Sequence, residues 1–255
     1  MIYDFKELLT KYELDGKLLA WQDEHNKKLK VAKLLIENSI KNSTLKPGQT
    51  LVEASAGSMA IAVSLVTMEK SVPFTVFTFE QVRDRLCPNT TLFSPVEEDL
   101  LPMLAFQKHA KQYAIENDAF YLNQFEDPYH CKIYENLGDD IFEQCHTKID
   151  CYIDKAGTAA TLRGIAEAAR KRFPEVEVLC LNNPGIPYIA FLKNFDFKLY
   201  MPKTEKHFDA INELKKNLEQ MYGIERLNEG LICIYSALEW LGNNPGKTVF
   251  TTIGD

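Results

Sequence analysis

Residues 150–165 read DCYIDKAGTAATLRGI, and this stretch decides the fold class. It opens with an apolar run at 150–154 that has the composition of a buried strand. Gly157 and Thr158 then supply a turn, and small and apolar residues follow with the spacing of a helix. A strand that leads directly into a helix is the unit from which parallel sheets are built.

The same order recurs along the chain. Apolar runs predict strands at 50–54, 73–78, 150–154, 177–181 and 248–253. Helical periodicity predicts helices at 27–41, 58–70, 99–116, 159–173, 207–222 and 228–241. The strands are continuous apolar runs, as in sheets that are covered on both faces. We therefore expect an α/β protein with mostly parallel sheets flanked by helices.

The strands and helices fall into two groups, one around 50–120 and one from 148 onward. Between them, the polar stretch NQFEDPYH at 123–130 predicts an irregular crossover. We expect a smaller, mobile α/β lobe at 45–145. A larger lobe would comprise 1–44 and 146–255, and a cleft would separate the two lobes.

Composition narrows the class of protein. The chain has 255 residues, 45% of them hydrophobic, and a net charge of -7, whereas a nucleic-acid surface favours a basic balance. There is no apolar run of about eighteen residues and no signal-like N-terminus, so we expect a cytoplasmic protein without membrane contact. Cys151, Cys180 and Cys233 lie in apolar runs and are expected to be reduced core residues.

Lys28 is the first candidate for chemistry. In a helix at 27–41, its neighbours three, four and seven residues on are Val31, Ala32 and Leu35, all apolar. The corresponding neighbours of Lys30 include charged residues. Lys28 is therefore expected to point inward, and a lysine that loses water can form a Schiff base. The alternative is a structural lysine whose stem lies along an apolar surface at a helix end.

Two strand-to-helix turns are candidate anion sites. One is formed by Ser55-Ala56-Gly57-Ser58, and the other follows the strand at 150–154 and begins at Gly157. The N–H groups at the start of a helix bind carboxylates or phosphates, helped by the helix dipole. The second turn suits a phosphate better, because Ala159 and Ala160 carry little side-chain bulk. For the first turn, the alternative is an ordinary strand-to-helix turn with a serine that caps the helix.

Other motifs are weak. Gly246-Lys247-Thr248 has the ending of a P-loop, but Gly242 is one residue too close and a strand-like run follows. The pairs His130-Cys131 and Cys145-His146 match no familiar zinc spacing, so no metal is predicted. The chain contains neither a GxSxG nor a GxGxxG motif.

Residues 121–164, YLNQFEDPYHCKIYENLGDDIFEQCHTKIDCYIDKAGTAATLRG, resemble the run LNQFxNPxN…HYxTTGPEIW…GTGGTxTG of the cysteine synthase and cystathionine β-synthase family. These are the fold type II pyridoxal-phosphate enzymes. LKPGQTLVEASAGSMAIA at 45–62 is similar to the family's LKPGxTIVEATSGNTGIA, and EGLICIYSALEWL at 229–241 is similar to EGIxxGxSSGAAV. The resemblance covers the chain from about residue 25 onward.

The resemblance implies a two-lobed fold type II architecture and the cofactor pyridoxal 5′-phosphate. The family's cofactor lysine lies upstream of KPG, and counting back 18 residues from Lys46 along an ungapped match gives Lys28. Lys28 would carry the cofactor as a Schiff base and later act as general base. Ser236 would face the pyridine nitrogen, and Gln124 the substrate carboxylate.

The remaining site residues also follow from the resemblance. The phosphate would be held by the residues that match GTGGT, namely Gly157, Thr158, Ala159, Ala160 and Thr161. The loop that matches TSGNT would take the substrate carboxylate through Ser55, Ala56, Gly57 and Met59, and its fourth residue, Ser58, would lie near the cofactor's 3′-oxygen. A homodimer and a site for a partner's peptide tail are further implications.

Several positions depart from the family pattern. Ser58 is shorter than the family's asparagine, and Met59 replaces a threonine. Ala159 and Ala160 replace glycines, and their methyl groups are expected to crowd a phosphate. The first hypothesis is β-elimination or β-replacement on serine, O-acetylserine or cysteine. The alternative is a cofactor-free, inactive homologue that binds an amino acid, a peptide tail or a partner protein in the same cleft.

Overall fold

The computed structural model describes all residues except 23–26, 98, 182–193, 202–207, 225–229 and 254–255. The chain forms two compact units, and each is described by itself. Unit 1 comprises Met1–Glu24 and Cys131–Asp255, and unit 2 comprises His25–His130. Unit 2 has other boundaries than the smaller lobe expected at 45–145, because it includes the helix at Lys27–Lys41 and ends at His130. The roles assigned to the two lobes stay predictions.

Unit 1 is built on a six-stranded sheet in the order β1-β2-β10-β7-β8-β9. Only β1 is antiparallel to its neighbour, and the other pairs are parallel. The strands are β1 (Ile2–Asp4), β2 (Lys17–Gln22), β7 (Cys151–Lys155), β8 (Glu177–Leu181), β9 (Lys198–Tyr200) and β10 (Thr248–Ile253).

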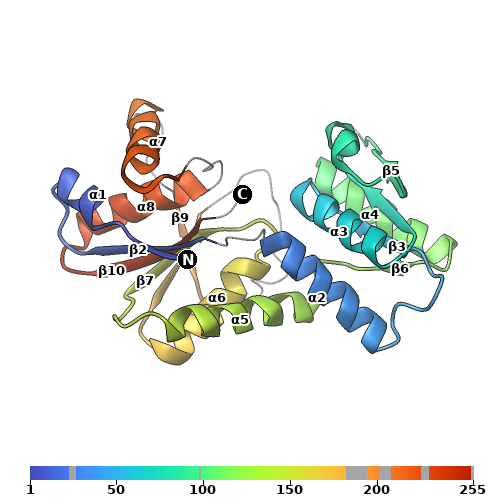
Figure 1. The fold of residues 1–255 in the computed structure, drawn as a ribbon, viewed down its shortest axis with the longest axis horizontal. Coiled ribbons are helices and arrows are strands. Elements are labelled where there is room, and N and C mark those ends of the chain that lie inside the picture. Colours follow the sequence, from blue (N-terminus) through green and yellow to red (C-terminus); the bar gives the residue numbers. More distant parts are fainter. Residues whose placement is uncertain (23–26, 98, 182–193, 202–207, 225–229, 254–255) are drawn as a thin grey trace. The chain divides into compact units, whose positions relative to one another are not determined.

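Helices cover both faces of this sheet, as Figure 1 shows. One face carries α1, α7 and α8, and the other carries α5 and α6. The helices are α1 (Lys6–Lys11), α5 (Pro128–Glu143), α6 (Ala160–Arg172), α7 (Phe208–Tyr222) and α8 (Gly230–Asn243). Two expected helix starts, at 207 and 228, lie outside the described residues.

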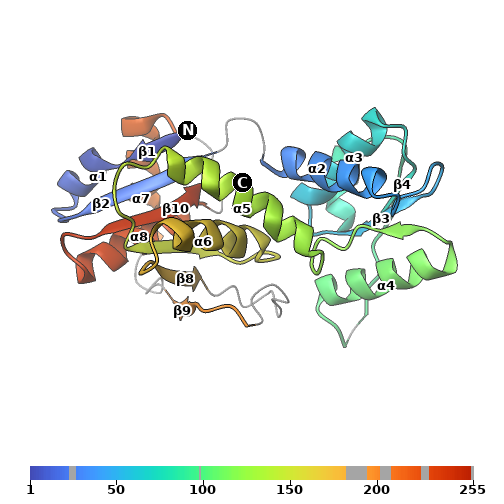
Figure 2. The same cartoon turned by 90° about the horizontal axis from the view of Figure 1, so that it is seen from below.

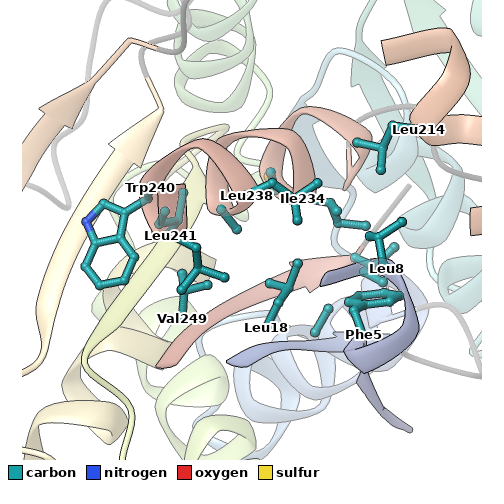
Figure 3. Close-up of a cluster of buried hydrophobic side chains, with 14 of the residues drawn as sticks. Phe5, Leu8, Leu18, Leu214, Ile234, Leu238, Trp240, Leu241 and Val249 are labelled. Carbon is teal, nitrogen blue, oxygen red and sulfur yellow. The ribbon is translucent and has the colours of Figure 1, made fainter. Parts of the chain in front are cut away.

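The main core of unit 1 lies beneath α8. Its apolar side chains pack against β2, β10 and α1, as the close-up in Figure 3 shows. Leu18, Ile234 and Val249 are fully buried there. All six cysteines are buried free thiols, and the predicted core positions of Cys151, Cys180 and Cys233 are confirmed.

Unit 2 contains a four-stranded, fully parallel sheet in the order β5-β4-β3-β6. In Figure 2, α2 and α3 lie on one side of this sheet and α4 lies on the other. The elements are α2 (Lys27–Lys41), β3 (Leu51–Ala54), α3 (Ser58–Glu69), β4 (Phe74–Phe77), the 3₁₀ helix η1 (Glu80–Arg85), β5 (Thr90–Phe93), α4 (Pro102–Glu116) and β6 (Phe120–Tyr121).

The predicted α/β class with mostly parallel sheets is thus confirmed. The strand ends are the part of this fold that matters for function, because α/β proteins bind ligands at the carboxyl ends of parallel strands. Both candidate anion sites lie there, after β3 in unit 2 and after β7 in unit 1. In the described part of the chain, no helix is long and apolar enough to cross a membrane.

Candidate functional site

The turn after β7 presents several backbone N–H groups that have no acceptor among the described residues. Ala159 adopts the left-handed conformation, with φ of 66°, directly before α6 begins at Ala160. The Ala160 N–H donates to the Thr158 hydroxyl at 3.4 Å. No acceptor within the described residues takes the N–H groups of Gly157, Thr158, Ala159 or Thr161. Four donors at the start of a 13-residue helix fit a phosphate group well.

The two alanines of this turn, Ala159 and Ala160, are both buried. Beside them, Gly157 is exposed, and a Cβ atom added there would meet nothing within 4 Å. The expected crowding of a phosphate by the two methyl groups stays a prediction.

The turn after β3 has the same design in unit 2. The Ser55 hydroxyl oxygen accepts the N–H groups of Gly57 at 3.3 Å and Ala60 at 3.1 Å, and it thereby caps α3. The N–H groups of Ser58 and Met59 have no acceptor within the described part of the chain. These two donors suit a carboxylate. The Met59 side chain is buried, so only its backbone faces the turn.

Lys28 lies in the first turn of α2 and is half-buried. Val31, Ala32 and Leu35, which share its helix face, are buried, whereas Lys30 is exposed. The predicted orientation of the helix is therefore correct. The role of Lys28 as the cofactor lysine stays a prediction at this point.

Gln124 belongs to a buried polar cluster in unit 2 that we call the Gln124 frame: Glu53, Ala54, Gln124 and His130. The Gln124 N–H donates to Glu53 Oε2 at 3.3 Å, and its side-chain Nε2 donates to the Ala54 carbonyl at 2.8 Å. The Ala54 N–H donates to Glu53 Oε1 at 2.7 Å. Burial raises the pKa of the Glu53 carboxyl to about 8, against the pull of these hydrogen bonds.

His130 is the residue of this frame whose pKa is affected by the charge of Lys28. Its Nδ1 lies 2.7 Å from the backbone carbonyl oxygen of Gln124, and its ring is fully buried. Burial, followed by the positive charge of Lys28, lowers the pKa of His130 to about 3. Since both residues belong to unit 2, Lys28 lies within electrostatic reach of the frame that holds Gln124.

Ser236 lies on α8 in unit 1 and is fully buried. Its hydroxyl donates to the Ile232 carbonyl at 2.7 Å, so the oxygen can still accept a hydrogen bond. One turn earlier on α8, the Cys233 thiol lies 3.7 Å from the Asp154 carboxylate. Hydrogen bonds to the same carboxylate come from the Tyr152 hydroxyl at 2.8 Å, the Lys155 N–H at 2.8 Å and the Thr252 hydroxyl at 2.7 Å.

Sequence reasoning assigned no role to three buried polar residues: Glu53, His130 and Asp154. A signal was present for the two acids, since each is a single charged residue inside an apolar strand run, LVEA or CYIDK. His130 carried no such signal, because its neighbours at 123–130 are polar. Among the described residues, no three His, Cys, Asp or Glu side chains form a group that could hold a metal ion.

Comparison with known protein families identifies the family of the chain. The model of the pyridoxal-phosphate dependent enzyme family matches residues 25–217, which is most of the chain. The chain belongs to this family. The expected cofactor, pyridoxal 5′-phosphate, is the one that defines it. The donor set of the turn after β7 fits the phosphate of that cofactor.

Relatives of this pyridoxal-phosphate family member include cysteine synthases. One from Staphylococcus aureus is 27% identical over 167 residues, which cover 63% of this chain and 54% of the relative. One from Dictyostelium discoideum is 26% identical over 184 residues, which cover 69% of this chain and 48% of the relative. The chain thus spans about half the length of the curated relatives that it matches.

Solved structures confirm the fold type II architecture. An O-acetylserine dependent cystathionine β-synthase from Helicobacter pylori matches with a TM-score of 0.83 and 18% identity, covering all of this chain and 92% of that one. A cysteine synthase from Entamoeba histolytica matches with a TM-score of 0.82 and 15% identity, covering 100% and 84%. At these identities, the likeness concerns the fold.

Proposed function

We propose that the chain is a pyridoxal-phosphate dependent enzyme that carries out β-elimination or β-replacement on a small amino acid of the serine, O-acetylserine or cysteine type. The observation that carries the proposal is the turn after β7, where four backbone N–H groups at the start of α6 have no acceptor among the described residues. Lys28, Gln124 and the turn suited to a carboxylate all belong to unit 2.

Three groups would hold the cofactor. The Lys28 amine would bind its carbonyl carbon, the N–H groups of the turn at 157–161 would bind its phosphate, and the Ser236 hydroxyl would face its pyridine nitrogen. When bound, pyridoxal phosphate supplies an electron sink for the pair of electrons left on the substrate's α-carbon. A neutral hydroxyl partner at the pyridine nitrogen suits β-elimination, because that chemistry does not need full protonation of the ring.

The substrate would be held by its carboxylate. The backbone N–H groups of Ser58 and Met59, which have no acceptor in the described part of the chain, and the side-chain amide of Gln124 would be donors for it in unit 2. Lys28 Nζ would take the proton from the α-carbon as general base. The bond from the β-carbon to its oxygen or sulfur substituent would then break, and the substituent would leave with the electron pair.

Relatives support this substrate class. The names of the similar proteins include cysteine synthase and an O-acetylserine dependent enzyme. A carboxylate-binding turn with a separate phosphate-binding turn is the donor arrangement that an amino acid and pyridoxal phosphate require together. A homodimer and a peptide-tail partner stay predictions.

The test uses the full chain with added pyridoxal phosphate. Loaded protein should be yellow, and it should release pyruvate from L-serine, acetate from O-acetyl-L-serine or sulfide from L-cysteine. Lys28→Ala should lose both the colour and at least about a thousandfold of the rate, since it removes the general base. The matched variant Lys30→Ala, on the exposed face of α2, should keep both.

Protein that stays colourless at a saturating concentration of pyridoxal phosphate would contradict the proposal. The alternative hypothesis, a cofactor-free homologue that binds an amino acid or a peptide, would then account for the conserved architecture. Retained activity in Lys28→Ala would instead assign the chemistry to another lysine.

A further inference from the structure

Gln124 is held on three sides by buried neighbours from different parts of unit 2. Glu53 on β3 accepts its backbone N–H, the Ala54 carbonyl accepts its side-chain N–H, and His130 at the start of α5 contacts its backbone carbonyl oxygen. All four residues are buried. A side chain that is fixed before a ligand arrives loses little conformational freedom on binding.

The direction of the His130 contact follows from chemistry. A carbonyl oxygen can only accept a hydrogen bond, so Nδ1 must carry the hydrogen that points to Gln124. A neutral imidazole has a single N–H, and burial together with the charge of Lys28 keeps the ring neutral by lowering the pKa of His130. The ring is therefore locked in one tautomer with its donor on the Gln124 carbonyl.

Gln124 is also connected by hydrogen bonds to the candidate anion-binding turn after β3. Ala54, which accepts the Gln124 side chain, is followed directly by Ser55, and the Ser55 hydroxyl caps the helix whose first N–H groups are free. Glu53 bonds both Ala54 and Gln124. The strand end, the anion-binding turn and Gln124 are thus parts of one hydrogen-bonded piece.

We propose that His130 and Glu53 are positioning residues that hold the backbone of Gln124, and thereby place its side-chain amide for the carboxylate of an amino-acid substrate. This inference rests on the proposed function for the identity of the ligand. Neither residue touches the substrate; each acts through Gln124. Loss of either contact should weaken substrate binding and leave the chemical step nearly unchanged.

Three variants separate the contact from the fold. His130→Leu keeps the volume and removes the donor. His130→Asn keeps an N–H donor on the atom that follows Cγ, as in the histidine ring. Glu53→Gln keeps the shape but turns one of two acceptors into a donor, so that one of the two N–H groups on Glu53 loses its partner.

The kinetic test compares these variants on the loaded full chain. We expect KM for the amino acid to rise about tenfold in His130→Leu and in Glu53→Gln, the size of one lost hydrogen bond, with kcat within about threefold of the unaltered chain. His130→Asn should restore KM. The proposal is overturned if His130→Leu keeps the original KM, or if kcat falls while KM stays constant.

A second measurement does not need activity. The backbone N–H of Gln124 is protected by its hydrogen bond to Glu53. Its hydrogen exchange should become about tenfold faster in Glu53→Gln and in His130→Leu, and it should stay slow in His130→Asn. Slow exchange in all three variants overturns the positioning role even if the chain binds no cofactor. If the exchange pattern is as predicted but the chain shows neither colour nor turnover, the proposed function is refuted and the positioning role is not.

Discussion

At the scale of single residues, the protein buries polar side chains that are stable in apolar surroundings only when they form hydrogen bonds. Glu53, His130 and Asp154 are all buried, and each has a defined hydrogen-bond partner. Burying a polar group without such partners costs several kcal/mol, on the order of the stability margin of a domain. These residues therefore fix the local geometry around the two strand ends that carry the candidate anion sites.

Glu53 should give the protein a specific pH dependence. Its folded pKa of about 8 lies above the ordinary value of 4.5, so the folded state keeps the proton while the unfolded chain releases it. Between these two values the free energy of unfolding should fall by about 1.4 kcal/mol per pH unit. Below 4.5 both states are protonated, and this stabilisation is fully present.

Glu53→Gln should remove that slope, and denaturant unfolding at several pH values measures it. The variant should be less stable than the unaltered chain near pH 5, because one N–H group loses its acceptor. The unaltered chain should lose about 4 kcal/mol between pH 5 and pH 8, so the difference should shrink and then change sign as the pH rises towards 8. A constant difference between the two proteins across this range would show that Glu53 is ionised in the folded state.

At the scale of elements, α5 and α6 come close enough to require a glycine. A Cβ atom added to Gly164 on α6 would lie 2.5 Å from the Cys131 carbonyl oxygen and 2.6 Å from the Tyr134 Cβ on α5. Backbone atoms cannot give way as a flexible side chain can. The contact between these two helices therefore depends on the absence of a side chain at this position.

Gly164→Ala should lower the free energy of unfolding by about 3 kcal/mol, the upper end of the cost of overpacking. Gly242→Ala is the matched control, because Gly242 lies in α8 and its added Cβ would meet only Leu14 Cδ2, at 3.7 Å. Alanine favours a helix, so this control should be neutral or more stable by up to about 1 kcal/mol. Equal stability of the two variants, measured by circular dichroism, would argue against the close helix packing.

Elements with a strong local pattern were predictable from the sequence. The helix expected at 27–41 matches α2, and the strands expected at 177–181 and 248–253 match β8 and β10. The strand β2 at Lys17–Gln22 was missed, because its place is set by pairing with β10, more than 220 residues away in sequence. The crossover expected at 123–130 instead leads into α5, which begins at Pro128.

The candidate site was predictable to a similar extent. The helical face of Lys28 and the two strand-to-helix turns follow from local sequence patterns. The Gln124 frame was not predictable, because it depends on contacts between residues about 70 positions apart, such as Glu53 and Gln124. Periodicity carries no information on such pairs.

At the scale of the whole molecule, the cofactor should stabilise the folded chain. A ligand that binds only the folded state adds about 2.7 kcal/mol at 100 times its dissociation constant. For a chain of this size we expect the melting temperature to rise by about 5 °C or more with saturating pyridoxal phosphate. Pyridoxal, which lacks the phosphate, should give a smaller rise, because the donors at 157–161 would have no anion to bind.

The same thermal scan can contradict this expectation. Equal shifts with pyridoxal and pyridoxal phosphate would exclude the turn after β7 as the phosphate site. Inorganic phosphate alone is the further control, since an unspecific anion effect would raise the melting temperature without pyridoxal.

The most direct test of the account is chemical trapping of the cofactor lysine. The full chain is incubated with pyridoxal phosphate, reduced with borohydride, digested and analysed by mass spectrometry. Reduction turns a Schiff base into a stable amine, so the modified peptide identifies the lysine. We predict the modification at Lys28. Modification at Lys27, Lys30 or Lys155, or no modified peptide at all, would contradict the central claim.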